Sequence, residues 1–165
     1  MSLRLLALAS LVAIVPSACI QVQGDTSAPV APPAGEFPFT FQGAGDAAIV
    51  VPVRLNGRGP YDFVLDTGAT LTCLDASLAR ELELSAARGV VGRAATLGST
   101  GGVDVYRLDS LAIGDAAVKD LMVCALDLQH IRAAGLDVDG LVGLNVLKQY
   151  KVTFDFERRM LRLDP

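Results

Sequence analysis

One carboxylate in this sequence stands out because it directly follows an apolar run. Val64 and Leu65 precede Asp66, and Thr67 and Gly68 come next. Burying an aspartate beside an apolar strand costs several kcal/mol unless its charge is partnered or its pKa rises. Such a cost requires a reason, and acid–base chemistry is one. The alternative is that Asp66 only caps a turn through its own side chain, as Asp commonly does in Asp-x-Gly sequences.

A second apolar motif lies more than 70 residues further on and could form the other wall of a site. Leu141, Val142 and Gly143 have the pattern of a short buried strand. Residues 145–150 follow and predict a short helix. The sequence therefore supplies a carboxylate on a glycine-containing turn and a separate apolar strand to support it.

Other kinds of catalytic site find little support. His130 is the only histidine, and no cluster of ligand residues surrounds it, so no metal or other cofactor is expected. We expect His130 to be a surface residue beside a helical turn. A cysteine nucleophile is disfavoured because Cys73 and Cys124 have no histidine nearby in the sequence.

The elements that must position these motifs are mainly strands. From residue 37 onward, short apolar runs alternate with turn residues, and no regular strand–helix alternation of a parallel α/β sheet or internal repeat is present. We expect hairpins at 48–65, with a turn at 56–60; at 111–126, with a turn at Gly114 and Asp115; and at 151–163, with a turn at 157–159.

Two or three short helices are expected among the strands. Residues 75–84 begin with Asp75, a candidate N-cap, and place Leu78, Ala79 and Leu82 at helical spacing. Leu82 and Leu84 should pack inward. The other helical segments are predicted at 128–134 and 145–150.

A glycine-rich segment at 90–108 differs from the other strands. Gly92, Gly98, Gly101 and Gly102 interrupt residues of strand propensity, and little bulk is available for a core. We expect a projecting, mobile hairpin there.

The two motifs together resemble those of the retropepsin-like aspartic peptidases of viruses and bacteria. The shared features are an apolar pair before Asp-Thr-Gly-Ala-Thr and, some 70 to 80 residues later, two apolar residues, a glycine and a short helix. The resemblance extends over most of 37–163 and implies a mostly β half-barrel of the acid-protease type. It implies a catalytic Asp66, an active-site turn of Thr67, Gly68, Ala69 and Thr70, and a supporting strand of Leu141, Val142 and Gly143.

The same resemblance implies how the site would be completed. The chain has one Asp-Thr-Gly turn, whereas two carboxylates sharing a proton are needed to activate water in this class. A two-fold symmetric homodimer would bring two copies of Asp66 together, with a peptide or protein as substrate. The family's substrate-covering flap would correspond to Leu97, Gly98, Ser99, Thr100, Gly101 and Gly102.

The resemblance also places Cys73 one strand beyond the catalytic turn and Cys124 on the strand leading toward Leu141. On that basis we expect the two thiols to be neighbours and to form a disulfide. The alternative is two small buried residues that happen to be cysteine.

The N-terminal residues predict export. Arg4 precedes the apolar run 5–15, which is too short to span a bilayer, and small residues then lead to Cys19. We therefore expect a signal peptide at 1–18, ending in a lipobox before a lipidated Cys19. Pro16 departs from the lipobox pattern, so ordinary cleavage, after Gly24 for instance, stays open.

The rest of the chain divides into a tether and one domain. Residues 19–35 are rich in Pro and Ala and predict a semi-rigid tether, and 36–165 form the peptidase domain. The expected location is the periplasm or cell envelope, with a lipid on Cys19 as the membrane contact. A formal charge of -4 argues against nucleic-acid binding.

Three functions are consistent with these residues. The first is an aspartic endopeptidase that cuts extracytoplasmic proteins. The second is a non-catalytic, peptide-binding envelope lipoprotein of the same fold, against which the intact Asp66-Thr67-Gly68 argues. The third is a peptidase that processes only its own tether.

Overall fold

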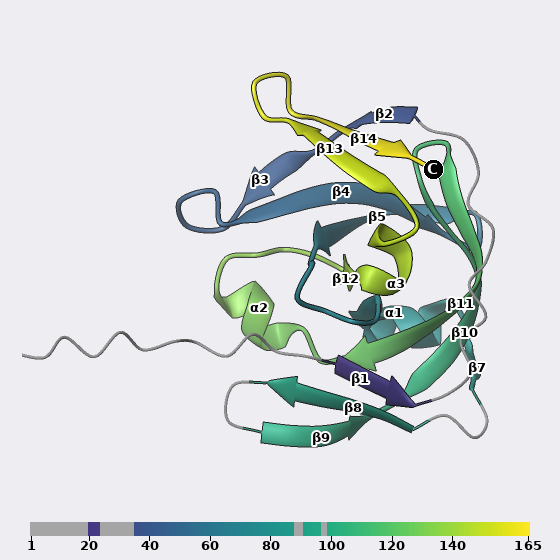
Figure 1. Cartoon of the computed structure of the whole chain (residues 1–165). Helices are drawn as coiled ribbons and strands as arrows, with labels where there is room; N and C mark the ends of the chain where they lie inside the picture. Colours follow the sequence, from purple (N-terminus) through teal and green to yellow (C-terminus); the bar gives the residue numbers. More distant parts are fainter. Residues whose placement is uncertain (1–19, 24–34, 88–90, 97–98) are drawn as a thin grey trace, which may run out of the picture.

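Six strands close into a barrel because β4 pairs with both β5 and β10. The computed structural model describes residues 20–23, 35–87, 91–96 and 99–165 (Figure 1). Around the barrel the order is β4 (Ala48–Leu55), β5 (Arg58–Leu65), β12 (Gly140–Val142), β6 (Cys73–Asp75), β11 (Ala116–Leu126) and β10 (Val105–Ile113). The short strands β3 (Thr40–Gln42) and β7 (Ser85–Ala86) add to β4 and β10.

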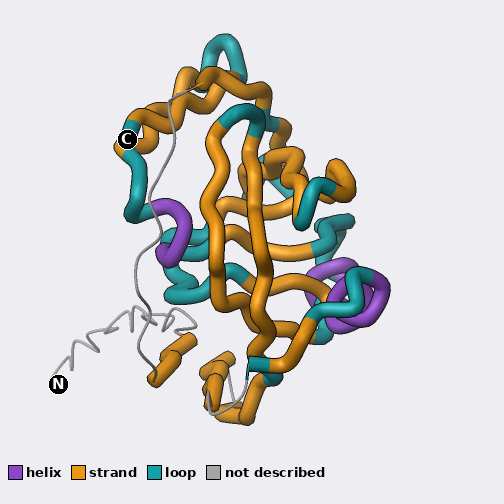
Figure 2. Tube along the Cα trace, turned by 90° about the vertical axis from the view of Figure 1, so that its right-hand side faces the viewer, coloured by secondary structure: helices purple, strands orange, loops and turns teal. Residues whose placement is uncertain are grey.

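Two small sheets lie at opposite ends of the barrel (Figures 1 and 2). One consists of β2 (Gly35–Pro38), β13 (Lys151–Asp155) and β14 (Met160–Asp164), in the order β13-β14-β2. The other consists of β1 (Ile20–Gln23), β8 (Val91–Thr96) and β9 (Ser99–Val103), in the order β1-β8-β9.

Three short helices connect the strands. They are α1 (Ala76–Glu81), α2 (Gln129–Ala133) and α3 (Leu144–Leu147). None of the helices in the described ranges is long and apolar enough to cross a membrane.

The barrel interior is the hydrophobic core. Val51, Val53 and Leu55 alternate along β4 and are fully buried, as expected for a strand with one face toward a core. They pack with Phe63 of β5 and Leu74 of β6 in one continuous cluster. β5 and β12 run parallel, so their carboxyl ends lie side by side at the same edge of the core. The residue that follows β5 is therefore fixed at that edge.

The predicted fold class is confirmed: the protein is mostly β with three short helices. All three hairpins and their turns form where expected. In the first hairpin the strand resumes already at Arg58, because Asn56 and Gly57 both have positive φ and make a two-residue turn.

The helix predictions hold with shorter bounds. Asp75 caps α1 as predicted, but the helix ends at Glu81 because Glu83 takes a positive φ. Leu82 and Leu84 pack against the core as expected. The last helix, α3, begins at Leu144 rather than at residue 145 and ends at Leu147.

One expectation about an irregular segment was wrong. The glycine-rich hairpin was expected to reach residue 108, but it ends at Val103, and Val105 and Leu108 are buried in β10. These two residues lie three positions apart, on opposite faces of the strand, so β10 is covered on both faces there and does not show the simple alternation of a strand with one buried face. Within the predicted tether, residues 20–23 form β1 and pair with β8.

Candidate active site

Asp66 is held at the end of β5 by a strand from a distant part of the sequence. β12 pairs with β5 in parallel, with Val142 opposite Leu65. The pairing continues one residue further, because the Asp66 N–H donates to the Val142 carbonyl at 3.0 Å. The two motifs singled out in the sequence therefore lie side by side.

The turn after Asp66 is closed by the aspartate itself. The Gly68 N–H donates to Asp66 Oδ1 at 2.8 Å, and the Ala69 N–H donates to the Asp66 carbonyl at 3.3 Å. Asp66 is half-buried, whereas Thr67 and Thr70 are exposed. Within the described residues no donor reaches Asp66 Oδ2, so one oxygen caps the turn and the other is free to act.

The supporting strand passes directly beneath this turn. The Leu144 N–H donates to the Ala69 carbonyl at 2.8 Å, and the Asn145 N–H donates to the Thr70 carbonyl at 3.0 Å. A Cβ atom at Gly143 would collide with backbone atoms of Leu71 and Thr72, so only glycine allows the approach. Leu141, Val142 and Gly143 thus occupy the position expected of them.

A buried polar network behind the turn was missed by sequence reasoning. Thr72 is completely buried, and its hydroxyl donates to Asn145 Oδ1 at 2.9 Å and accepts from the Gly143 N–H at 3.1 Å. Asn145 Oδ1 also accepts from the Thr72 N–H at 2.8 Å, while Asn145 Nδ2 donates to the Met122 carbonyl at 2.9 Å. An asparagine within the apolar run 141–147 was the signal that could have revealed it.

Asp66 lines an apolar pocket of about 280 Å³. His130, which is exposed on α2 as the sequence predicts, also lines this pocket. The pocket can therefore take an apolar side chain next to Asp66. Its lining is formed by Val64, Asp66, Leu128, His130, Ile131, Ala134, Leu136, Val138, Gly140 and Leu141.

The glycine-rich hairpin consists of β8 and β9, and Figure 1 shows it beyond α2 and β11 at one end of the molecule. Of the residues assigned to the flap, Ser99, Thr100, Gly101 and Gly102 lie in β9, and Leu97 and Gly98 lie outside the described residues. Val103 at its base packs against the cluster of Leu71, Cys73 and Cys124. Its role over Asp66 stays a prediction.

Cys73 and Cys124 are joined by a disulfide in the structure. Their Cα atoms are 4.4 Å apart, and both residues are fully buried. They lie directly opposite each other on β6 and β11, which pair in parallel. The bond ties β6, the strand that follows the Asp-Thr-Gly turn, to β11, the strand that precedes α2.

The carboxylate of Asp62, on β5, is repelled by neighbouring carboxylates. Burial raises the pKa of Asp62, and the carboxylates of Asp139 and Asp137 raise it further. Asp139 Oδ2 accepts from the Asp62 N–H at 3.0 Å, so the two residues are kept together despite this repulsion.

This is the retropepsin-like acid-protease fold. Its defining features are the barrel, the Asp-Thr-Gly turn beside β12, and the short helix α3 that follows β12. A retropepsin-like aspartic protease from Rickettsia conorii has a similar structure, with a TM-score of 0.54 and 20% identity over 84% of this chain and 96% of that chain. The sequence matches the aspartyl protease family over residues 51–146, from β4 to α3. The chain belongs to this family. No curated protein matches it.

Proposed function

We propose that the protein is an aspartic endopeptidase whose catalytic group is Asp66. The observation that carries this proposal is the position of Asp66, which accepts a hydrogen bond from the Gly68 N–H through one oxygen and lines an apolar pocket. A carboxylate that served only to cap its turn would not need to line a pocket. Membership of the aspartyl protease family agrees with this assignment.

The proposed active unit is a homodimer, because one chain has a single Asp-Thr-Gly turn. One Asp66 carboxylate accepts a proton from water as the water oxygen attacks the peptide carbonyl carbon, and its protonated twin donates to the carbonyl oxygen. Collapse of the tetrahedral intermediate breaks the C–N bond: the first Asp66 passes the proton it took from water to the leaving nitrogen, and the second Asp66 takes a proton back from a hydroxyl of the intermediate as the carbonyl re-forms. Atoms and charges balance without a metal or other cofactor.

The proposed substrate is an extended peptide segment with an apolar side chain beside the cleaved bond. Most of the pocket lining at Asp66 is aliphatic, and only Asp66 and His130 contribute ionisable groups to it. The hairpin of β8 and β9 would close over the bound peptide, so its opening would help to set turnover.

We also propose that the protein is exported and acts outside the cytoplasm. Residues 1–18 would be the signal peptide, Cys19 the lipidated residue and 19–35 the link to the envelope. The disulfide between Cys73 and Cys124 supports an oxidising compartment, since such bonds rarely persist in the cytosol. N-terminal sequencing and mass measurement of the mature chain test this, and a chain that still begins at Met1, with Cys73 and Cys124 as free thiols, refutes it.

The catalytic assignment is tested by Asp66→Asn, with Asp62→Asn as the matched control on the same strand. Asp62 is exposed and does not line the pocket. Cleavage of an unfolded protein at mildly acidic pH should be lost in the first variant and kept in the second. Cleavage that survives Asp66→Asn refutes the assignment.

A non-catalytic, peptide-binding protein is the second candidate, favoured by the Asp66–Gly68 hydrogen bond, which gives the carboxylate a structural use. It predicts that the wild-type chain binds extended peptides without cutting them. Mass spectrometry of the peptides after incubation separates the two candidates.

A further inference from the structure

The wall of the pocket opposite β5 is formed by a segment with little support of its own. Residues 128–138, here called the pocket wall, contain α2, which has five residues, none of them buried. Its N-cap, Leu128, offers no side-chain hydrogen bond to the helix. A helix this short is not stable alone, so contacts outside it must hold it in place.

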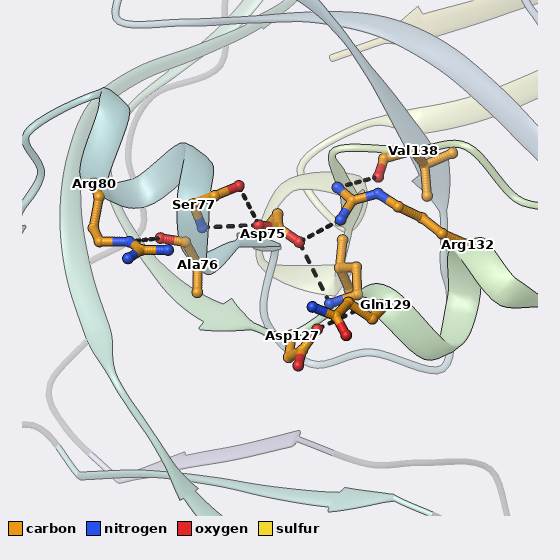
Figure 3. A network of polar contacts seen from close by, with 9 residues as sticks. Asp75, Ala76, Ser77, Arg80, Asp127, Gln129, Arg132 and Val138 are labelled. Atoms are coloured by element: carbon orange, nitrogen blue, oxygen red, sulfur yellow. Dashed lines mark hydrogen bonds and ion pairs between the residues drawn. The ribbon is translucent and has the colours of Figure 1, made fainter.

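The Gln129 N–H donates to Asp127 Oδ1 at 2.9 Å, and further contacts come from one buried carboxylate, that of Asp75. Asp75, only 6% exposed, accepts a hydrogen bond from Arg132 Nη1 to its Oδ2 at 2.9 Å. The Leu128 N–H approaches the same oxygen at 3.4 Å. Figure 3 shows Asp75 between the start of α1 and the guanidinium group of Arg132. The Asp75 side chain therefore contacts both Leu128, at the start of α2, and Arg132, within the helix.

Arg132 extends this connection to the other end of the pocket wall. Its Nη2 donates to the Val138 carbonyl at 3.2 Å. The next residue, Asp139, accepts from the Asp75 N–H through its carbonyl at 2.8 Å. The pair of Asp75 and Arg132 thus holds Leu128, Val138 and the helix between them in place relative to β6.

The rest of the Asp75 carboxylate is also engaged. Oδ1 accepts from the N–H of Ser77 at 2.8 Å and from its hydroxyl, which caps α1. Burial alone would raise the pKa of Asp75, but the hydrogen bonds from Ser77 and the contact with Arg132 outweigh it, and the pKa lies below its usual value. The ion pair therefore persists at the mildly acidic pH at which the proposed peptidase would work.

We propose that Asp75 and Arg132 are positioning residues whose ion pair, formed by a buried carboxylate and a partly exposed guanidinium, fixes the pocket wall, and thereby sets which substrate side chains fit beside Asp66. Leu128, Ile131 and Ala134 reach the pocket from the segment that the pair holds. The effect on substrate choice rests on the proposed peptidase function, whereas the effect on the pocket wall does not.

The first arm of the test needs no activity. Arg132→Gln removes the cationic partner of Asp75, and Arg58→Gln is its control, because Arg58 pairs with Glu81 on the surface and does not line the pocket. Amide hydrogen exchange in 128–136 should become about tenfold faster or more in Arg132→Gln while β4 and β5 keep their protection. Unchanged exchange in 128–136 overturns the proposal.

The second arm measures selectivity. Peptides that differ only in having alanine or leucine beside the cleaved bond are compared by kcat/KM. The wild type should prefer leucine, and Arg132→Gln should lower this preference about tenfold, mainly through KM. Arg58→Gln should leave it unchanged. A preference that Arg132→Gln retains in full overturns the proposed role in selectivity.

Failure of the proposed function and failure of the Arg132→Gln variant to fold have different consequences for the test. If the wild type cuts no peptide, the proposed function fails, and hydrogen exchange alone decides whether the pair positions the pocket wall. If Arg132→Gln does not fold because it leaves a buried charge unpaired, the double variant Asp75→Asn/Arg132→Gln carries both arms, since it removes both charges.

Discussion

The two sides of the pocket at Asp66 are built in different ways. The catalytic turn is held mainly by backbone hydrogen bonds, including Asp66 N–H to the Val142 carbonyl and Leu144 N–H to the Ala69 carbonyl. The pocket wall across from it is held largely by side chains, with Arg132 and Asp75 at the centre. One side is held by strand pairing, the other by side-chain hydrogen bonds and the ion pair of Asp75 with Arg132.

This difference indicates which side can change without loss of the fold. Backbone contacts beneath the turn leave no room for a Cβ at Gly143, so sequence variation there should cost stability. A side-chain pair can be exchanged for another while the barrel stays closed. We therefore expect the turn to fix the chemistry and the pocket wall to adjust which substrates are accepted.

Gly143→Ala should give the largest loss. The added methyl group would overlap the backbone of Leu71 and Thr72, and overpacking of this kind costs about 3 kcal/mol in free energy of unfolding. Urea denaturation measures it. Gly102→Ala is the control, because Gly102 has open space around its Cβ position and an ordinary φ. Equal stability of the two variants would show that the turn is not as rigid as described.

Asn145→Ala should come next, at about 2 kcal/mol, because it leaves the buried Thr72 N–H and the Met122 carbonyl without their partner. Peptidase activity should fall with it, since the network lies behind the catalytic turn. Lys148→Ala, an exposed position at the end of the same helix, is the control. If Asn145→Ala is as stable as Lys148→Ala, the buried network of Thr72 and Asn145 does not stabilise the turn as described.

Asp75→Asn should lower the free energy of unfolding by less than Asn145→Ala does. The loss should occur only at pH values at which the Asp75 carboxylate of the wild type is ionised. Because the pKa of Asp75 is lowered in the folded state, its stabilising effect is present at neutral pH and is lost as the pH falls below about 4. Urea unfolding of the wild type and the variant at pH 7 and at pH 3 tests this. A difference that is the same at both values would mean that the charge on Asp75 does not matter.

Asp62→Asn should give the smallest effect, with the opposite sign. Burial raises the pKa of Asp62, and repulsion from Asp139 and Asp137 raises it further, so its ionised form opposes folding. The variant should therefore be slightly more stable at pH 7 and equal to the wild type at low pH. Because Asp62 is exposed, the gain should be smaller than each loss above. Thermal unfolding at the two pH values would reveal a wrong sign.

Local patterns predicted most of the strands because they are encoded within short distances. The Asn56–Gly57 turn and the alternation in 48–55 needed no information from elsewhere in the chain. The insertion of β12 between β5 and β6 joins segments more than 60 residues apart, and strand patterns alone do not specify such partners. It followed only from the resemblance to a known family.

The pocket wall could not be predicted for the same reason. Asp75 was identified as a helix cap, which is a local role, but its partner Arg132 lies 57 residues away in a segment with no strong periodic pattern. The end of the glycine-rich hairpin was misjudged because Val105 and Leu108 lie on opposite faces of β10, and their burial does not follow the alternation of a strand with one buried face.

The claim that Asp66 forms half of a site is tested most directly by mixing chains. Wild-type chain is equilibrated with a ninefold excess of Asp66→Asn chain and compared with the same amount equilibrated with an unrelated protein, with peptide substrate in large excess. Activity should fall to about a tenth, because about one wild-type chain in ten then finds a wild-type partner. Undiminished activity would mean that one chain suffices, and would contradict the account.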